Sequence, residues 1–102
     1  MGLLDILGFG QNKKLVEDAI KRGGTVVDVR TPQEFAQGHL DGSKNYPLDN
    51  LSSHIEKLKK LEPLILVCAS GMRSGSANKM LKNKGLDCCN GGSWRGLEKN
   101  IN

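Results

Sequence analysis

Two patterns of apolar positions alternate along the chain, one typical of strands and one typical of helices. Short apolar or β-branched runs predict strands over 25–30 and 64–68, with shorter extended segments near 45–46 and over 86–90. Between them, apolar positions three or four residues apart predict helices over 12–22, 31–38, 51–62, 74–84 and 94–101. Strands that alternate with helices predict an α/β fold, with a small, mainly parallel sheet flanked by helices on both faces.

Side chains that begin helices mark two of these segments. Thr31 can cap the helix after the first strand, Pro32 suits the first helical turn, and Glu34 completes a capping box. Ser53 and Glu56 have the same spacing and predict a second capping box. Both helices are therefore expected to begin at a side-chain cap.

The run 64–68 is continuously apolar, as expected of a central parallel strand covered on both faces, and Cys68 is its last residue. Parallel sheets bind ligands beyond the carboxyl ends of their strands. The small residues after Cys68 lead into a predicted helix, so loop amides and the positive end of the helix dipole can converge on one point. An anion is stabilised at such a point, and a sulfur there has a lowered pKa and acts as a nucleophile near neutral pH.

Two residues of this loop fit the same picture. Gly71 can adopt the positive φ that a tightly curled loop needs. Arg73 either adds a fixed cation or ties the loop to the rest of the domain. On the local sequence alone, the alternative that Cys68 is only a buried thiol at a strand end stays open.

Composition and charge narrow the class of partner. The 102 residues, 37% of them hydrophobic and 25% charged, suit one small globular domain, and the net charge of +4 attracts small anions. Aromatic residues make up 4%, too few for the stacking surface that single-stranded nucleic acid uses. The segment 1–11 is too short to cross a membrane and lacks the basic start of a signal peptide, and its structure is left open. We therefore expect neither nucleic acid nor a membrane as a partner.

The chain has three cysteines, which lack the spacing of a disulfide framework or of a four-ligand zinc site. Reduced thiols in the cytoplasm, with no bound metal, are therefore expected. Cys88 and Cys89 are neighbours in a predicted strand, so their side chains should point to opposite faces. We interpret both as small buried hydrophobic residues; the alternative is that one of them takes sulfur from Cys68.

Several motifs resemble, in their order along the chain, the rhodanese domain in its single-domain form. The resemblance runs from about Thr25 to Trp94. Its motifs are Asp28-Val29-Arg30, Glu34-Phe35, the turn 38–43, Asn45-Tyr46-Pro47, the loop 68–74 and Gly91-Gly92. It implies one rhodanese-like domain over residues 1–102, with an active-site loop in which Cys68 carries sulfur.

The resemblance also implies an activity, the transfer of sulfane sulfur through a persulfide on Cys68. The donor is of the class of thiosulfate or a persulfide, the acceptor is cyanide, a thiol or an acceptor protein, and no cofactor is required. Ala69 and Ser70 are neutral where some thiosulfate-specific relatives carry cations, so the natural donor stays open. The residues expected to bind the substrate are Ala69, Ser70, Gly71, Met72, Arg73 and Arg30.

Alternatives stay open for Arg30 and for the activity. Arg30 either draws in an anionic donor or forms an ion pair that secures a turn. Cysteine phosphatases that share this fold family need a loop one residue longer than the one between Cys68 and Arg73, which argues against that activity. A non-catalytic rhodanese-like sulfur carrier or protein-interaction module is the alternative to an enzyme, although such copies typically lack the loop cysteine.

Overall fold

The computed structural model describes residues 10–101, which form a four-stranded sheet with helices on both faces. The strands are β1 (Thr25–Asp28), β2 (Lys44–Asn45), β3 (Leu64–Cys68) and β4 (Cys88–Ser93). Their order across the sheet is β2-β1-β3-β4, and every pair of neighbours is parallel. The predicted fold class is therefore confirmed. Residues 1–9, most of the segment 1–11 for which the sequence predicts no structure, lie outside the described residues.

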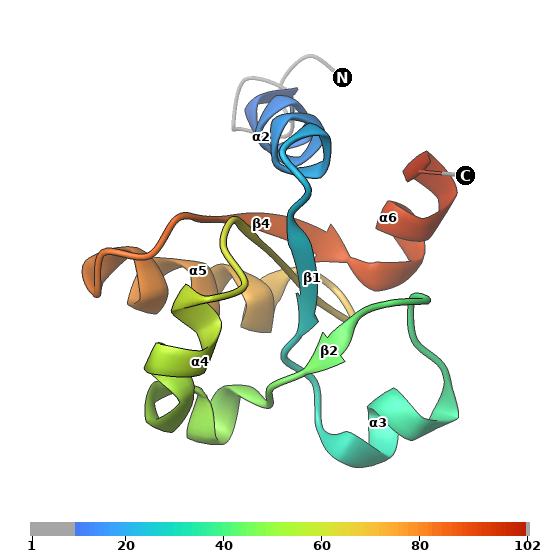
Figure 1. The fold of residues 1–102 in the computed structure, drawn as a ribbon. Coiled ribbons are helices and arrows are strands. Elements are labelled where there is room, and N and C mark those ends of the chain that lie inside the picture. Colours follow the sequence, from blue (N-terminus) through green and yellow to red (C-terminus); the bar gives the residue numbers. More distant parts are fainter. Residues whose placement is uncertain (1–9, 102) are drawn as a thin grey trace.

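Helices connect the strands and cover both faces of the sheet. They are α2 (Gly10–Lys21), α3 (Pro32–Gln37), the 3-10 helix η2 (Leu48–His54), α4 (Ile55–Lys59), α5 (Met72–Asn83) and α6 (Trp94–Ile101). In Figure 1, α2 and α6 lie on one side of the sheet, and α4 and α5 lie on the other. Over residues 10–101, no helix has the length and apolar character needed to span a bilayer.

The alternating side chains of β3 join the two layers, which is why this strand is apolar throughout. Leu64, Leu66 and Cys68 point into the cluster under η2, α4 and α5, where Ala77 and Leu81 are also buried. The intervening residues of β3 point into the second cluster, under α2 and α6. All five residues of the strand are fully buried. The functional loop that follows Cys68 is thus attached to the most deeply buried strand of the domain.

One of the two predicted capping boxes is present and the other is not. The Thr31 Oγ1 atom accepts a hydrogen bond from the Glu34 amide at 3.2 Å, and a Glu34 carboxylate oxygen accepts one from the Thr31 amide at 3.1 Å. The prediction for Ser53 and Glu56 is wrong, because η2 runs directly into α4. The chain before α4 is already helical, and the Ser53 hydroxyl donates to the carbonyl of Asn50 instead.

Strand β4 begins later than predicted and continues through the glycine pair to Ser93. Its pairing with β3 shifts by one residue, so that Leu66 lies opposite Asn90 and Val67 lies opposite Gly92. The extra residue is Gly91, where a Cβ atom would lie 2.8 Å from the Ile65 side chain. Close packing therefore requires glycine here. The shift brings the end of β4 beside Cys68, which pairs with Ser93.

Candidate active site

Cys68 ends the central strand, and its sulfur lies beneath the loop that leads into α5. The Gly71 amide donates a hydrogen bond to Sγ at 3.0 Å, and the Ser74 amide donates another at 3.3 Å. The Ser74 hydroxyl lies 3.4 Å from the same sulfur. The predicted convergence of loop amides and the start of a helix on Cys68 is therefore present in the structure.

Gly71 allows the loop to curl tightly enough to make these bonds. It is the N-cap of α5 and has a φ of 98°, in the left-handed region that side-chain-bearing residues rarely adopt. A Cβ atom at this position would also lie 3.3 Å from the Cα atom of Gly92 in β4. The backbone conformation and the close approach of β4 both favour glycine.

Burial and hydrogen bonding shift the pKa of the Cys68 thiol in opposite directions. Burial raises the pKa, because a thiolate loses its hydration in the interior. Hydrogen bonds from the Ser74 hydroxyl and from the backbone amides around the sulfur lower it, and together they outweigh burial. The resulting pKa lies below the ordinary value of a cysteine, which favours the nucleophilic thiolate.

Cys88 and Cys89 have the opposite character. Their side chains point into different core clusters on opposite faces of the sheet, as predicted, and both are buried. Burial raises the pKa of Cys88 to about 11 and also raises that of Cys89. Cys88 pairs with Leu64 at the far end of β3, about 13 Å along the strand from Cys68. That separation is too long for a disulfide with Cys68.

Arg73 forms a bidentate ion pair with Glu34. Its Nη1 and Nη2 atoms lie 2.7 Å and 2.9 Å from the two carboxylate oxygens. Arg73, and then the Thr31 amide, lower the pKa of Glu34 to about 2, so the carboxylate stays ionised. The structure therefore contains the contact that ties the loop to the domain, because the arginine links α5 to α3, and a role for Arg73 in binding the substrate stays a prediction.

Arg30 is buried in an ion pair with Asp28. Its Nε and Nη2 atoms donate to the carboxylate at 3.0 and 2.8 Å, and Nη2 also donates to the carbonyl of Gly38 at 2.7 Å. The guanidinium lies over the Trp94 ring, 4.9 Å from its centroid. Within residues 10–101, none of these polar partners belongs to the loop after Cys68. The structure thus has the turn-securing ion pair, and a role for Arg30 in binding the donor stays a prediction.

Asn90 belongs to the site, although no motif in the sequence predicts a role for it. Its Oδ1 atom accepts hydrogen bonds from the Ser74 hydroxyl at 2.7 Å and from the Gly92 amide at 2.9 Å. Its Nδ2 atom donates to the carbonyl of Gly71 at 3.2 Å. The signal that could have identified it is a polar residue inside an otherwise apolar or glycine-rich strand, directly before the glycine pair.

The outer surface of the loop is uncharged. Ala69 and Ser70 are exposed, and Met72 exposes 80% of its surface, whereas the Cys68 side chain beneath them exposes none. The nearest arginine in the chain, Arg73, is paired with Glu34. Among the described residues, no group of three His, Cys, Asp or Glu side chains is placed to hold a metal ion.

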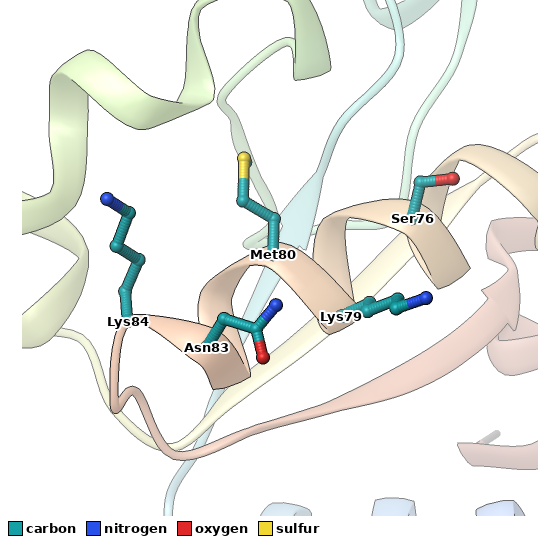
Figure 2. A pocket seen from close by; sticks show the side chains of 5 residues that line it. All are labelled: Ser76, Lys79, Met80, Asn83 and Lys84. Carbon is teal, nitrogen blue, oxygen red and sulfur yellow. The ribbon is translucent and has the colours of Figure 1, made fainter.

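A separate hollow lies along the C-terminal half of α5 (Figure 2). Its volume is about 400 Å³, and its lining residues are Ser76, Lys79, Met80, Asn83 and Lys84. None of them touches the sulfur of Cys68 or belongs to the loop. The residues that surround Cys68 are therefore the candidate site.

Comparison with known proteins identifies the same region of the chain. The family model for the rhodanese-like domain matches residues 12–96. The thiosulfate sulfurtransferase GlpE of Shewanella oneidensis is 32% identical over 74 residues, which cover 72% of this chain and 73% of that protein. The uncharacterized protein YqhL of Bacillus subtilis is 34% identical over 76 residues, 72% of this chain. GlpE of Stutzerimonas stutzeri is 38% identical over 64 residues, 63% of this chain. The matches span only 60% and 59% of the lengths of these last two proteins.

Solved structures share the fold. A rhodanese-related protein from Thermoplasma volcanium superposes with a TM-score of 0.70 at 28% identity, over 87% of this chain and 88% of that chain. The reduced Bacillus anthracis CoADR-RHD superposes with a TM-score of 0.69 at 34% identity, over 80% of this chain and 15% of that one. The motifs quoted from the sequence therefore lie on the fold that they imply.

Proposed function

The chain belongs to the rhodanese-like domain family, and from this premise we propose that it is a sulfurtransferase whose Cys68 carries sulfane sulfur as a persulfide. The observation that carries the proposal is the set of hydrogen-bonding groups around one sulfur at the end of the central strand. Two amides and one hydroxyl lie 3.0–3.4 Å from Sγ, and the pKa of this thiol is lowered. Relatives named thiosulfate sulfurtransferase support the reaction class.

In the first half of the reaction, the Cys68 thiolate attacks the outer sulfur of the donor. A new S–S bond forms to Cys68 while the bond between the outer sulfur and the rest of the donor breaks. The bonding pair leaves with the donor, as sulfite when the donor is thiosulfate and as a thiolate when it is a persulfide. The enzyme is left with a persulfide anion on Cys68.

In the second half, a nucleophilic acceptor removes the outer sulfur and restores the thiolate. Cyanide becomes thiocyanate, and a thiolate becomes a persulfide. No external oxidant, reductant or cofactor enters either step. The exposed Met72 side chain beside the loop offers an apolar contact to an acceptor protein.

Negative charge stays at the loop throughout this cycle, first on the thiolate and then on the persulfide. The amides of Gly71 and Ser74 are already oriented toward the sulfur in the resting protein, so the thiolate is stabilised before the donor arrives. Because the loop covers Cys68 completely, local opening over Ala69–Met72 admits the donor.

Intact-mass spectrometry after incubation with a donor tests the proposal. Wild-type protein should gain about 32 Da, the mass of one sulfur atom, and lose it on addition of cyanide or a thiol. Cys68→Ser should gain nothing, whereas Cys88→Ser and Cys89→Ser should still take up sulfur, since neither cysteine lies near the loop. A wild-type protein that takes sulfur from no donor would instead favour the non-catalytic interaction module.

A further inference from the structure

The Ser74 hydroxyl has one proton and two possible acceptors for it. Its Oγ atom lies 2.7 Å from Oδ1 of Asn90 and 3.4 Å from Sγ of Cys68. When Cys68 is a neutral thiol, its S–H can donate to Oγ while the hydroxyl donates to Asn90. When Cys68 is a thiolate, the sulfur has no proton to give, and the hydroxyl stabilises it only by turning its own proton toward Sγ.

We infer that Asn90 is a positioning residue whose Oδ1 atom competes with the Cys68 thiolate for the single proton of the Ser74 hydroxyl, and thereby limits how readily the thiolate forms. The inference concerns the ionisation of Cys68, and its importance for turnover rests on the proposed function.

The side-chain amide of Asn90 is held in the orientation that this competition needs. The Gly71 carbonyl can only accept, so it lies next to the Nδ2 end, and the Gly92 amide can only donate, so it lies next to Oδ1. When Ser74 turns its proton to the sulfur, Oδ1 keeps the hydrogen bond from Gly92. The Asn90 amide oxygen therefore has a donor in both states of the hydroxyl.

Where α5 packs against β4, a glycine leaves space for the side-chain amide of Asn90. Gly75 lies in the first turn of α5, and a Cβ atom there would come within 3.3 Å of Nδ2 of Asn90. Glycine is unfavourable inside a helix, so the space it leaves for this amide has a cost in stability. The Gly71 carbonyl also accepts the helical hydrogen bond from the Gly75 amide at 3.0 Å, so it retains a partner if Asn90 is replaced.

The charged groups around Cys68 are the same in the wild type and in the alanine variants at Ser74 and Asn90. Arg73 of α5 is paired with Glu34 of α3, and Asp28 of β1 is paired with Arg30. Changes at Ser74 or Asn90 to uncharged residues remove none of these charges. A shift in the ionisation of Cys68 can therefore be assigned to the hydroxyl proton.

The test is the pH dependence of alkylation of Cys68 by iodoacetamide, followed on the tryptic peptide 61–73, which contains this cysteine alone. In Ser74→Ala the midpoint should rise by about one pH unit, because one hydrogen bond to the thiolate is lost. In Asn90→Ala it should fall by about half a unit, since the hydroxyl is free to donate to the sulfur. The double variant should behave like Ser74→Ala.

The direction of the shift separates this role from a structural one. If Asn90 only braced the loop, its loss would loosen the amides and raise the midpoint, as Ser74→Ala does; an unchanged or raised midpoint in Asn90→Ala overturns the inference. Asn78→Ala is the matched control, an asparagine of α5 whose side chain is outside this network, and its midpoint should stay that of the wild type.

A second variant decides the question if Asn90→Ala fails to fold. In Asn90→Asp the carboxylate holds the Ser74 proton more strongly, so the midpoint should rise by more in the wild-type background than in the Ser74→Ala background. Equal rises in both overturn the inference. Because alkylation does not need a sulfur donor, a protein with these shifts that never takes up sulfur would refute the proposed function and leave the inference standing.

Discussion

The guanidinium of Arg73 and the carboxylate of Glu34 face each other in two parallel hydrogen bonds of 2.7 and 2.9 Å, across 39 residues of sequence. Arg73 lies in the first turn of α5, and Glu34 lies in the first turn of α3. The pair therefore fixes the end of the loop that begins at Cys68 against a helix that follows β1. It also cancels the charge of the arginine closest to Cys68 in the chain.

Replacement of Arg73 should impair sulfur loading more than stability. Arg73→Ala should lower the rate of persulfide formation by about 10-fold or more, because the loop amides lose their fixed positions. Arg73→Lys should recover only part of that loss, since lysine cannot form the two parallel bonds. The melting temperature should change little, because the pair is more than one-third exposed. Intact-mass spectrometry of samples quenched at timed intervals gives the rates of persulfide formation.

Arg22→Ala is the control for this comparison. Arg22 also makes an exposed ion-paired contact, with Asp18 and Asp87, and it lies away from the loop. Its loss should leave persulfide formation unchanged. Equal rates for Arg73→Ala and Arg22→Ala would show that the Glu34 pair has no part in holding the loop.

The uncharged mouth of the site should favour a persulfide donor over thiosulfate. Thiosulfate carries two negative charges, and the exposed loop residues Ala69, Ser70 and Met72 offer it no cation. We expect kcat/KM with glutathione persulfide to exceed that with thiosulfate, and Ala69→Lys to raise the thiosulfate value about 10-fold relative to the persulfide value. Ala69→Gln is the size-matched control without charge. Thiosulfate preferred by the wild-type protein would contradict this expectation.

The lowered pKa of Cys68 predicts the direction of the pH profile. The thiolate is the reactive form, so the rate of persulfide formation should rise with pH through the folded pKa of Cys68, with a midpoint below that of a cysteine in an unstructured peptide. Glu34, with a pKa of about 2, stays ionised through this range, and its pair with Arg73 does not contribute to the acid limb. A midpoint equal to or above that of the unstructured peptide would contradict the lowered pKa.

The raised pKa of Cys88 predicts a loss of stability at high pH. The folded state keeps this thiol protonated up to about pH 11, whereas the unfolded chain ionises it near its ordinary value. The stabilisation is therefore fully present below that ordinary value and is lost as pH rises toward 11. Urea unfolding from pH 8 to 11 should show a steeper decline in the free energy of unfolding for the wild type than for Cys88→Ala. Parallel declines would show that Cys88 ionises equally in both states.

Local sequence predicted the elements that are defined by their own residues. The buried strand ending at Cys68, the capping box of Thr31 and Glu34, and the glycine at position 71 each depend on neighbours in sequence. The role of Asn90 could not be predicted in this way, because Asn90 meets Ser74 only through the one-residue shift at Gly91. The pairing of Arg73 with Glu34 could not be predicted either, since an ion pair between two helices depends on how both helices pack.

Gly71→Ala should disrupt the site through both backbone strain and crowding. The residue has a φ of 98°, and a new Cβ atom would lie 3.3 Å from Gly92 in the neighbouring strand. The conformation alone costs about 1–2 kcal/mol for an alanine. The loop should relieve the strain by rotating, which moves the Gly71 amide away from Sγ and raises the pKa of Cys68.

Gly85→Ala separates these effects. Gly85 has a φ of 84° after α5, but a Cβ atom there would meet nothing within 4 Å. It should lower the free energy of unfolding by about 1 kcal/mol and leave the alkylation midpoint of Cys68 unchanged. Gly71→Ala should lower the free energy of unfolding by more and raise that midpoint. Of these two glycines, only Gly71 has an amide that donates a hydrogen bond to the sulfur. If both variants left the midpoint at the wild-type value, the Gly71 amide would have no part in stabilising the thiolate, and the hydroxyl and amide of Ser74 would have to account for most of the lowered pKa.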